Sequence, residues 1–210
     1  MKISRVAQSC FFLESEAGKI IAIDPYKILE GHERADVVLI THPHPDHYDS
    51  KSLARIKKDD TKIVCPASCK QIITAWNASG LAVGESLELA GIMIKAVPAY
   101  NKKKLFHSRG KKYIGYVFTV DGKSVYHAGD TDFIDEMKEI QSPDVAFLPI
   151  GGLFTMNAAG AIETIKAIKP AMVVPMHELK QDLAAFAAKV QLEVPNIKVC
   201  ILKAGESTTA

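Results

Sequence analysis

Cysteine, aromatic residues and long apolar runs are all scarce in this chain. Its 210 residues include 4 cysteines and 1 tryptophan, and phenylalanine, tryptophan and tyrosine together make up 7%. The cysteines stand at positions 10, 65, 69 and 200, a scatter that fits neither a disulfide framework nor a zinc knuckle, which needs a second pair. Buried free thiols are the simpler interpretation, and they predict a reducing, cytoplasmic location.

Charge of one sign is also lacking. The chain has 26 lysines and arginines against 24 acidic residues, which gives no electrostatic basis for general nucleic-acid binding. No apolar run approaches the ~20 residues of a membrane span, and we expect no secretory signal at the start of the chain. Hydrophobic residues nevertheless make up 48%, so we expect one domain over residues 1–210 with a core of its own. The oligomeric state stays open.

Short apolar runs alternate with helical patterns along the whole chain. The all-apolar run 37–40 predicts a strand covered on both faces, and Asp121-Gly122 predicts a hairpin. A layered α/β sandwich of mixed sheets is expected. Strands are expected over 10–14, 19–23, 37–41, 62–65, 92–97, 115–120, 124–128, 145–149, 172–175 and 198–202. Helices are expected over 50–57, 68–78 and 180–190, and between an Asn157 cap and Pro170.

The strongest chemical signal is the segment Thr41-His42-Pro43-His44-Pro45-Asp46-His47, directly after the apolar strand. Imidazole nitrogen and carboxylate oxygen are the usual ligands of zinc and related ions. On an extended backbone, alternation aims His42, His44 and Asp46 to one side. His47 then points to the other side, and the two prolines stiffen the segment. A solvated histidine-rich turn is the alternative.

Four donors from one loop do not complete a catalytic site, so we expect partners from elsewhere in the chain. His107 lies in a lysine-rich loop, Asp130 follows the strand 124–128, and His177 ends the strand 172–175. Gly129 permits a sharp turn before Asp130. Ligands at the ends of successive strands predict a metal site at one edge of the sandwich.

These motifs, together with Ile23-Asp24-Pro25, His-Ala-Gly-Asp-Thr at 127–131 and Pro-Met-His at 175–177, resemble those of the metallo-β-lactamase fold superfamily. Within it the chain is similar to the small, stand-alone metal-dependent hydrolases, a branch that includes ascorbate-6-phosphate lactonase-like and N-acyl-phosphatidylethanolamine phospholipase D-like proteins. The resemblance implies a four-layer αββα sandwich, with two mixed β-sheets flanked by helices. Many relatives have Gly-His where this chain has Ala7-Gln8-Ser9, so any role of that histidine near the metals is lost or altered here.

The resemblance also implies a set of metal ligands. His42, His44 and His107 correspond to the ligands of a first metal ion. Asp46, His47 and His177 correspond to those of a second, and Asp130 bridges the two.

Two neighbouring cations lower the pKa of a shared water from about 16 toward ~7. The implied enzyme is a dinuclear hydrolase whose metal-bound hydroxide cleaves a small ester, lactone or phosphodiester. Asp46 and Asp130 are the implied catalytic residues, with Asp46 steering a proton. Zinc is the expected metal, and manganese and iron suit the same donors.

Other residues near these ligands have two interpretations each. Asp24 either hydrogen-bonds a ligand histidine or forms a turn before Pro25. Gly151 and Gly152 either offer backbone N–H groups to a substrate or make a plain turn. His127 is expected to be packed or to support a ligand, and His32 to lie on the surface.

Basic residues surround His107. They favour an anionic small-molecule substrate if they overhang the metals, and otherwise they form a solvated face. Whether the loop 102–104 contacts substrate stays open. Tyr100 and Asn101 are expected to line the site. The basic residues are Lys102, Lys103, Lys104, Arg109, Lys111 and Lys112.

An iron-dependent redox enzyme of the dioxygenase type is the alternative function on the same scaffold. Di-iron relatives usually replace a loop histidine by an acid, and the intact segment 42–47 argues against that, which leaves a mononuclear iron enzyme. A binding or sensor protein with a vestigial site is disfavoured by the complete ligand set. Antibiotic hydrolysis is not expected of a cytoplasmic chain.

Overall fold

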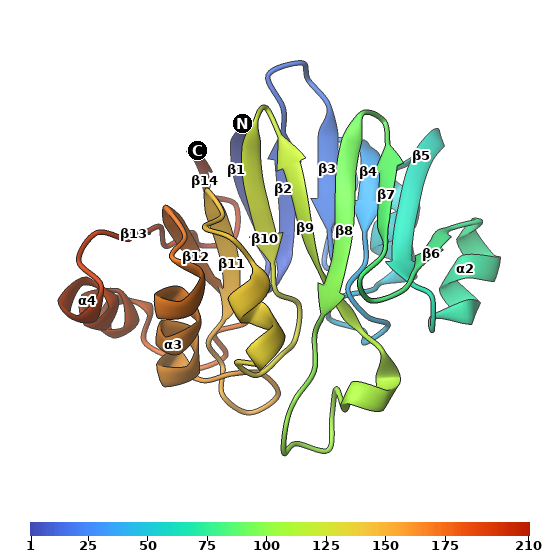
Figure 1. Ribbon diagram of the computed structural model, residues 1–210. Coiled ribbons are helices and arrows are strands. Elements are labelled where there is room, and N and C mark those ends of the chain that lie inside the picture. The colour runs from blue at the N-terminus through green and yellow to red at the C-terminus, as the bar shows by residue number, and fades with distance from the viewer.

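Two seven-stranded mixed sheets face each other in the computed structural model, which describes residues 1–210 (Figure 1). The first sheet has the spatial order β14 (Ser207–Thr209), β1 (Lys2–Ala7), β2 (Cys10–Glu14), β3 (Ile20–Ile23), β4 (Ala35–Leu39), β5 (Lys57–Pro66) and β6 (Ser79–Leu81). The second has the order β13 (Lys198–Val199), β12 (Met172–Met176), β11 (Val145–Pro149), β10 (Lys123–His127), β9 (Ile114–Val120), β8 (Ile92–Pro98) and β7 (Ser86–Leu89).

Helices cover the outer faces of both sheets. α1 (Ser50–Ile56) and α2 (Lys70–Trp76) pack on the first sheet, while α3 (Ala158–Ile168) and α4 (Leu183–Glu193) pack on the second. Figure 1 shows α3 and α4 beside β11 and β12, and α2 beside β6. Two short 3₁₀ helices, η1 (Arg109–Lys111) and η2 (Asp135–Glu139), lie in connecting loops. This is the expected αββα order of layers.

β4 illustrates how alternation builds the layers. Val37 and Leu39 belong to the core between the sheets, whereas Val38 packs with residues of α1 and α2 on the outer face. The two sheets meet where the rings of Phe11 and Phe147 approach to 4.4 Å between centroids. Burying a valine or leucine side chain of β4 contributes about 1.5–3 kcal/mol to the free energy of folding. The prediction of a doubly covered strand is confirmed for residues 37–39, and Ile40 is buried just beyond the end of β4.

Local hydrogen bonds place the ends of the predicted elements. The Asn157 side chain accepts from Gly160 N at 2.9 Å and caps α3, as predicted. α4 begins at Leu183, later than expected, because the Asp182 side chain caps it. Asp121 and Gly122 have φ of 52° and 71° and join β9 to β10 in the predicted hairpin.

Four strands escape prediction because they are short or weakly patterned. β6 and β7 have three and four residues at sheet edges, too few for alternation to stand out. β14 is a Ser-Thr-Thr segment that is extended by pairing with β1, and β1 itself has a mixed polar sequence. The expected strand 198–202 stops at Val199, since β12 pairs only with its first two residues.

The carboxyl ends of β4, β8, β10 and β12 lie at one edge of the sandwich, and both chain termini lie at the opposite edge (Figure 1). At the loop edge the sheets are tied together by a hydrogen bond from Ile114 N to Thr41 O at 3.3 Å. Every residue expected to bind metal lies in the loops of this edge. None of the helices has the length and apolar character that a transmembrane helix needs.

Candidate metal centre

The histidine-rich segment after β4 folds into a turn. His44 O accepts from His47 N at 3.0 Å and from Tyr48 N at 2.8 Å. The expected alternation along an extended chain is therefore wrong beyond His44. The turn brings His47 back beside His42, with ring centroids 4.1 Å apart. His47 therefore lies at the same site as His42 and His44, not on the opposite side.

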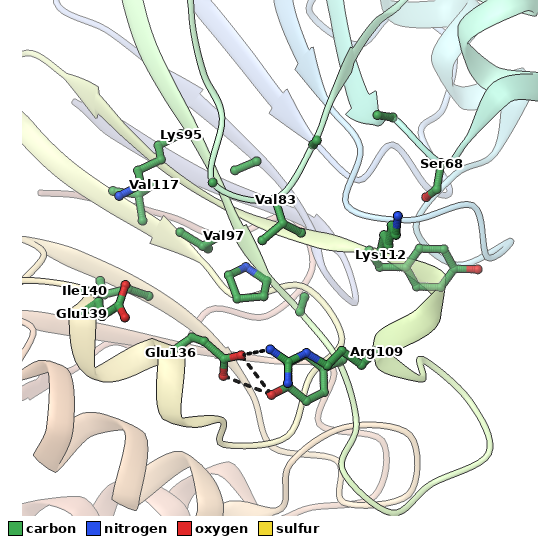
Figure 2. Close-up of a pocket in the computed structure, with 18 of the residues that line it drawn as sticks. Ser68, Val83, Lys95, Val97, Arg109, Lys112, Val117, Glu136, Glu139 and Ile140 are labelled. Atoms are coloured by element: carbon green, nitrogen blue, oxygen red, sulfur yellow. Dashed lines mark hydrogen bonds and ion pairs between the residues drawn. The ribbon is translucent and has the colours of Figure 1, made fainter.

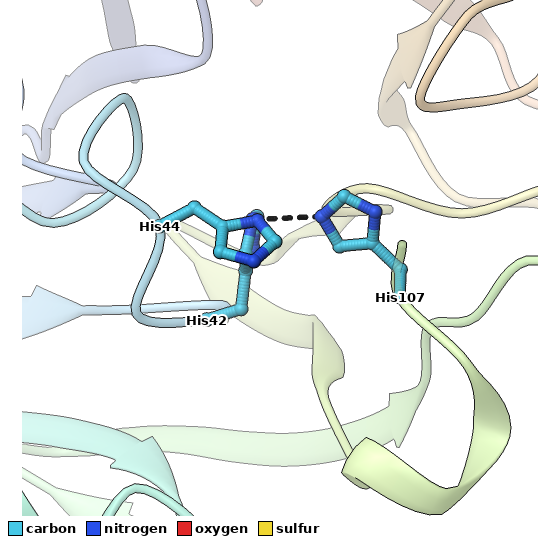
Figure 3. A group of neighbouring side chains, drawn as sticks. All are labelled: His42, His44 and His107. Atoms are coloured by element: carbon cyan, nitrogen blue, oxygen red, sulfur yellow. Dashed lines mark hydrogen bonds between the residues drawn. The ribbon is translucent and has the colours of Figure 1, made fainter. Parts of the chain in front are cut away.

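A first group of donors consists of His42, His44 and His107. Their ligand nitrogens lie within 4.8 Å of one another, and Nε2 of His107 lies 3.2 Å from Nε2 of His42. Figure 3 shows the rings from the two loops converging. Two ring nitrogens that face each other at this distance can share a proton or bind one cation between them.

A second group consists of Asp46, His47 and His177, again with donor atoms within 4.8 Å. Asp46 Oδ2 lies 3.4 Å from His177 Nε2 and 3.9 Å from His47 Nε2. The rings of His47 and His177, which come from separate loops, stack with an interplanar angle of 20°.

Asp130 lies between the two groups. Its Oδ1 is 3.2 Å from His47 Nε2, and its Oδ2 is 3.3 Å from His177 Nε2 and 3.4 Å from His107 Nε2. The carboxylate is almost fully buried. The two oxygens of the Asp130 carboxylate thus face imidazoles of both groups.

Several of these atoms are buried without a hydrogen-bond partner, namely His47 Nε2, His177 Nε2 and Asp130 Oδ1. An unpaired buried polar atom costs about 1–3 kcal/mol, and here such atoms converge on common points. Nitrogen and carboxylate oxygen donors at this spacing suit a divalent metal ion. The donor set therefore fits the metal that the motif predicts.

The pKa values of His42, His107 and Asp130 agree with a donor role, whereas His177 is protonated at neutral pH, so a metal ion at its Nε2 would have to displace a proton. Burial lowers the pKa of His42 well below its usual value and that of His107 to about 4, so both are neutral at neutral pH. Burial alone would also lower the pKa of His177, but Asp130 and Asp46 raise it to about 9. Burial alone would raise the pKa of Asp130, yet His47 and His177 lower it well below its usual value. Asp130 is thus an anionic donor.

Asp24 holds the motif from behind. Its Oδ1 accepts from Thr41 N at 2.7 Å, and its Oδ2 lies 2.8 Å from Thr41 Oγ1 and 2.7 Å from His47 Nδ1. Thr41 Oγ1 in turn lies 3.0 Å from His42 Nδ1. The expected hydrogen bond between Asp24 and a motif histidine is present, with Asp24 Oδ2 as the acceptor and His47 Nδ1 as the donor. One carboxylate therefore orients His47 directly and His42 through Thr41.

Asn101 fixes the loop that carries His107. Its Nδ2 donates to Phe106 O at 3.0 Å and to Phe154 O at 2.6 Å, and its N–H donates to His107 O at 2.8 Å. His107 itself has a left-handed backbone, with φ of 59°. Asn101 therefore lies beside the site as expected, and its contacts hold the loop.

Tyr100 and two residues of the basic loop have acidic partners in the fold. The Tyr100 hydroxyl donates to Glu136 at 3.0 Å, and the Arg109 guanidinium lies over the Tyr100 ring while pairing with the same Glu136 at 2.9 Å. Lys104 forms an ion pair with Asp132. Two of the six cations are thus neutralised by acidic partners.

A cavity of about 980 Å³ lies beside the centre and is lined by Tyr100, Arg109, Glu136, Tyr113 and apolar residues of β8 (Figure 2). The Tyr113 ring is 5.3 Å from the His42 ring, measured between centroids. Tyr113 therefore lies next to both the cavity and the first donor group, and Tyr100 lines this cavity.

The two glycines after β11 have packing roles. A Cβ on Gly151 would lie 2.4 Å from His177 O, so the close approach of this loop to His177 requires glycine. Gly152 N donates to Met156 O at 3.1 Å, which leaves this N–H unavailable to a substrate. The plain-turn interpretation is therefore correct for Gly152.

The two remaining histidines outside the donor groups are packed. His127 is buried, with Nε2 3.3 Å from Ser9 O and Nδ1 accepting from Gly129 N, as expected of a packed histidine. His32 is partly exposed and packs on Phe12 at 4.2 Å between ring centroids, so it lies at the surface with one face of its ring covered.

Gln8 is a residue of the site that the motifs do not predict. Its Nε2 donates to Asp46 Oδ2 at 2.5 Å, although it stands 38 positions away in sequence. The departure from the Gly-His of many relatives at 7–9 marked this position, but only the fold places its amide on Asp46.

The comparisons with known proteins agree with this geometry. A family model described as a beta-lactamase superfamily domain matches residues 2–177. The chain is thus a member of the β-lactamase superfamily, as its motifs suggested.

A metal-dependent hydrolase of Archaeoglobus fulgidus is 30% identical over 230 residues, which cover 99% of this chain and 98% of that protein. The chain belongs to the same family, the UPF0173 metal-dependent hydrolases. A crystal structure from Parabacteroides distasonis aligns with a TM-score of 0.87 at 29% identity, over 96% of this chain and 93% of the other. A metallo hydrolase of Ignicoccus hospitalis aligns with a TM-score of 0.84 at 30% identity, over 99% and 97%.

Proposed function

We propose that the chain is a dinuclear metal hydrolase. His42, His44 and His107 would hold one divalent ion, and Asp46, His47 and His177 would hold the other, with Asp130 between them. The observation that carries the proposal is the overlap of these donor groups at Asp130, whose two oxygens face imidazoles of both groups at 3.2–3.4 Å. Zinc is the first choice of metal, and manganese and iron suit the same donors.

Bound divalent ions would lower the pKa of a water molecule to supply the nucleophile and would polarise the oxygen of the scissile carbonyl or phosphoryl group. The chain's own residues orient this chemistry. Asp46 is 36% exposed, so its carboxylate can pass a proton between the reaction centre and solvent. Because Gln8 and His177 engage Oδ2, Oδ1 is the oxygen left to accept that proton.

The proposed substrate is a small ester, lactone or phosphodiester. An anionic substrate is favoured by Lys102, Lys103, Lys111 and Lys112. These four form no ion pair with the chain's own acids, unlike Lys104 and Arg109. A positive potential next to the metal centre raises the local concentration of such a substrate.

The proposal treats residues 1–210 as one hydrolase domain, supported by relatives that align over nearly their whole length. A reducing, cytoplasmic location is supported by the four unpaired cysteines, of which three are buried.

The test is an activity screen over phosphodiesters, lactones and thioesters with Mn²⁺ or Zn²⁺ added, run in parallel on the wild-type chain and Asp130→Ala. We expect metal-dependent hydrolysis of one class by the wild type and none by the variant. Oxidation of a substrate with one iron per chain would favour the redox alternative. Full activity of Asp130→Ala with two bound ions would contradict the assignment of Asp130.

A further inference from the structure

Gln8 occupies a backbone position that favours glycine. It is the first residue of the two-residue connection between β1 and β2, where Ala7 pairs with Cys10, and its φ is +30°. A positive φ at the first residue of such a hairpin is normally met by glycine or asparagine. A longer side chain there strains the backbone, and such strain persists only where the surroundings fix it.

A buried arginine supplies that fixation. The Arg5 guanidinium is 4% exposed and donates to Gln8 O through Nε at 3.2 Å and Nη2 at 2.6 Å. The same group pairs with Glu178 Oε2 at 2.5 Å and donates to Leu202 O at 2.9 Å. Glu178 directly follows the donor His177, so Arg5 joins the Gln8 turn to the loop that carries His177.

The strained turn presents its amide to one atom of the metal centre. Gln8 Nε2 donates to Asp46 Oδ2 at 2.5 Å, and this is the oxygen that faces His177 Nε2 at 3.4 Å. Asp46 is more exposed than any other donor of its group, and its carboxylate contacts Gln8 in addition to the two histidines of that group. An amide N–H keeps its proton at every physiological pH, so the restraint does not depend on pH.

We propose that Gln8 is a positioning residue that holds Asp46 Oδ2 toward His177 and thereby sets the metal affinity of the group Asp46, His47 and His177. The proposal rests on the proposed function of that group as a metal site. Partners that orient a metal ligand typically contribute 10–100-fold in metal affinity. The first group, which Gln8 does not contact, keeps its affinity.

Two backgrounds isolate the two groups for the test. His107→Ala leaves the second group as the intact one, and His177→Ala leaves the first. Each background, with and without Gln8→Met, is stripped of metal and titrated with Zn²⁺ against a chromophoric chelator. Methionine has the length of glutamine but no N–H donor. Gln71→Met, at an exposed position of α2, is the matched control.

We expect Gln8→Met to weaken Zn²⁺ binding about 10–100-fold in the His107→Ala background and to leave it unchanged in the His177→Ala background. Equal affinity in the first background, or equal weakening in both, overturns the proposal. If the metal-free variant unfolds at a markedly lower temperature, Gln8→Asn, which keeps the amide but is too short to reach Asp46, replaces it. A wild-type chain that fails to bind two ions would instead contradict the proposed function.

Discussion

Replacing Asp24 by asparagine exchanges one carboxylate oxygen for an NH₂ group without changing the size of the side chain. In the native site Oδ2 accepts from Thr41 Oγ1 and faces His47 Nδ1 at 2.7 Å. A proton on Nδ1 leaves Nε2 of His47 free to bind metal. An NH₂ group at this place donates to Nδ1, which moves the ring proton to Nε2 and blocks the metal-binding atom.

The alternative orientation of the asparagine turns its oxygen to His47 and its NH₂ group to Thr41 N. Two donors then face each other in a fully buried place, and one is left without an acceptor. The unpaired donor costs about 1–3 kcal/mol. A free-energy difference of 1.4 kcal/mol changes a binding constant tenfold. Either orientation of the asparagine therefore predicts a loss of metal affinity of about 10–100-fold. His42 is oriented through Thr41, so the substitution affects both donor groups.

The assay is a Zn²⁺ titration of the metal-free chain, with Asp144→Asn as the matched control. Asp144 accepts from Ser124 N at 2.8 Å and Ser124 Oγ at 2.9 Å, much as Asp24 accepts from Thr41, but it lies at the opposite ends of the strands. We expect Asp24→Asn to bind Zn²⁺ more weakly than the wild type and Asp144→Asn to bind it as tightly as the wild type. Unchanged affinity of a folded Asp24→Asn chain would refute the reasoning that Asp24 sets the ring proton of His47.

Three further outcomes are expected. His107→Ala should lower the bound metal from two ions to one, measured by elemental analysis; unchanged content would mean that another residue fills this place. Gly151→Ala should lower the free energy of unfolding in urea by about 1–3 kcal/mol, because its Cβ would lie 2.4 Å from His177 O, whereas Gly110→Ala, with open space around it, should change it little. Burial raises the pKa of Cys10 to about 12, so at pH 8 only about one Cys10 side chain in ten thousand is ionised to the thiolate. A thiol reagent should therefore label Cys10 only after denaturation. Rapid labelling of the folded chain would contradict this burial.

The proposed donors other than His107 could be predicted from sequence because they follow strands whose apolar pattern is clear. The run before His42 and the strands before Asp130 and His177 all end at the same edge of the sandwich, which brings their loops together. His107 lies in a long loop without such a pattern. Its place depends on contacts such as those of Asn101 with Phe106 and Phe154, which join residues far apart in the chain.

Other features depended on partners that no local pattern reveals. The sequence around Lys104 indicates a free cation, but the fold places Asp132 beside it. The alternation expected through His47 failed because a turn closed on His44 O instead. Gln8 is a polar residue in a hairpin, and only the packing of Arg5 turns it toward the metal centre. Long-range polar contacts of this kind carry no periodic signal.

The most direct measurement is anomalous diffraction at the zinc edge from crystals grown with Zn²⁺. We expect two peaks per chain, one among His42, His44 and His107 and one beside Asp46 and the other donors of its group, with the Asp130 carboxylate between them. A single peak, or two peaks that Asp130 does not join, would contradict the dinuclear centre.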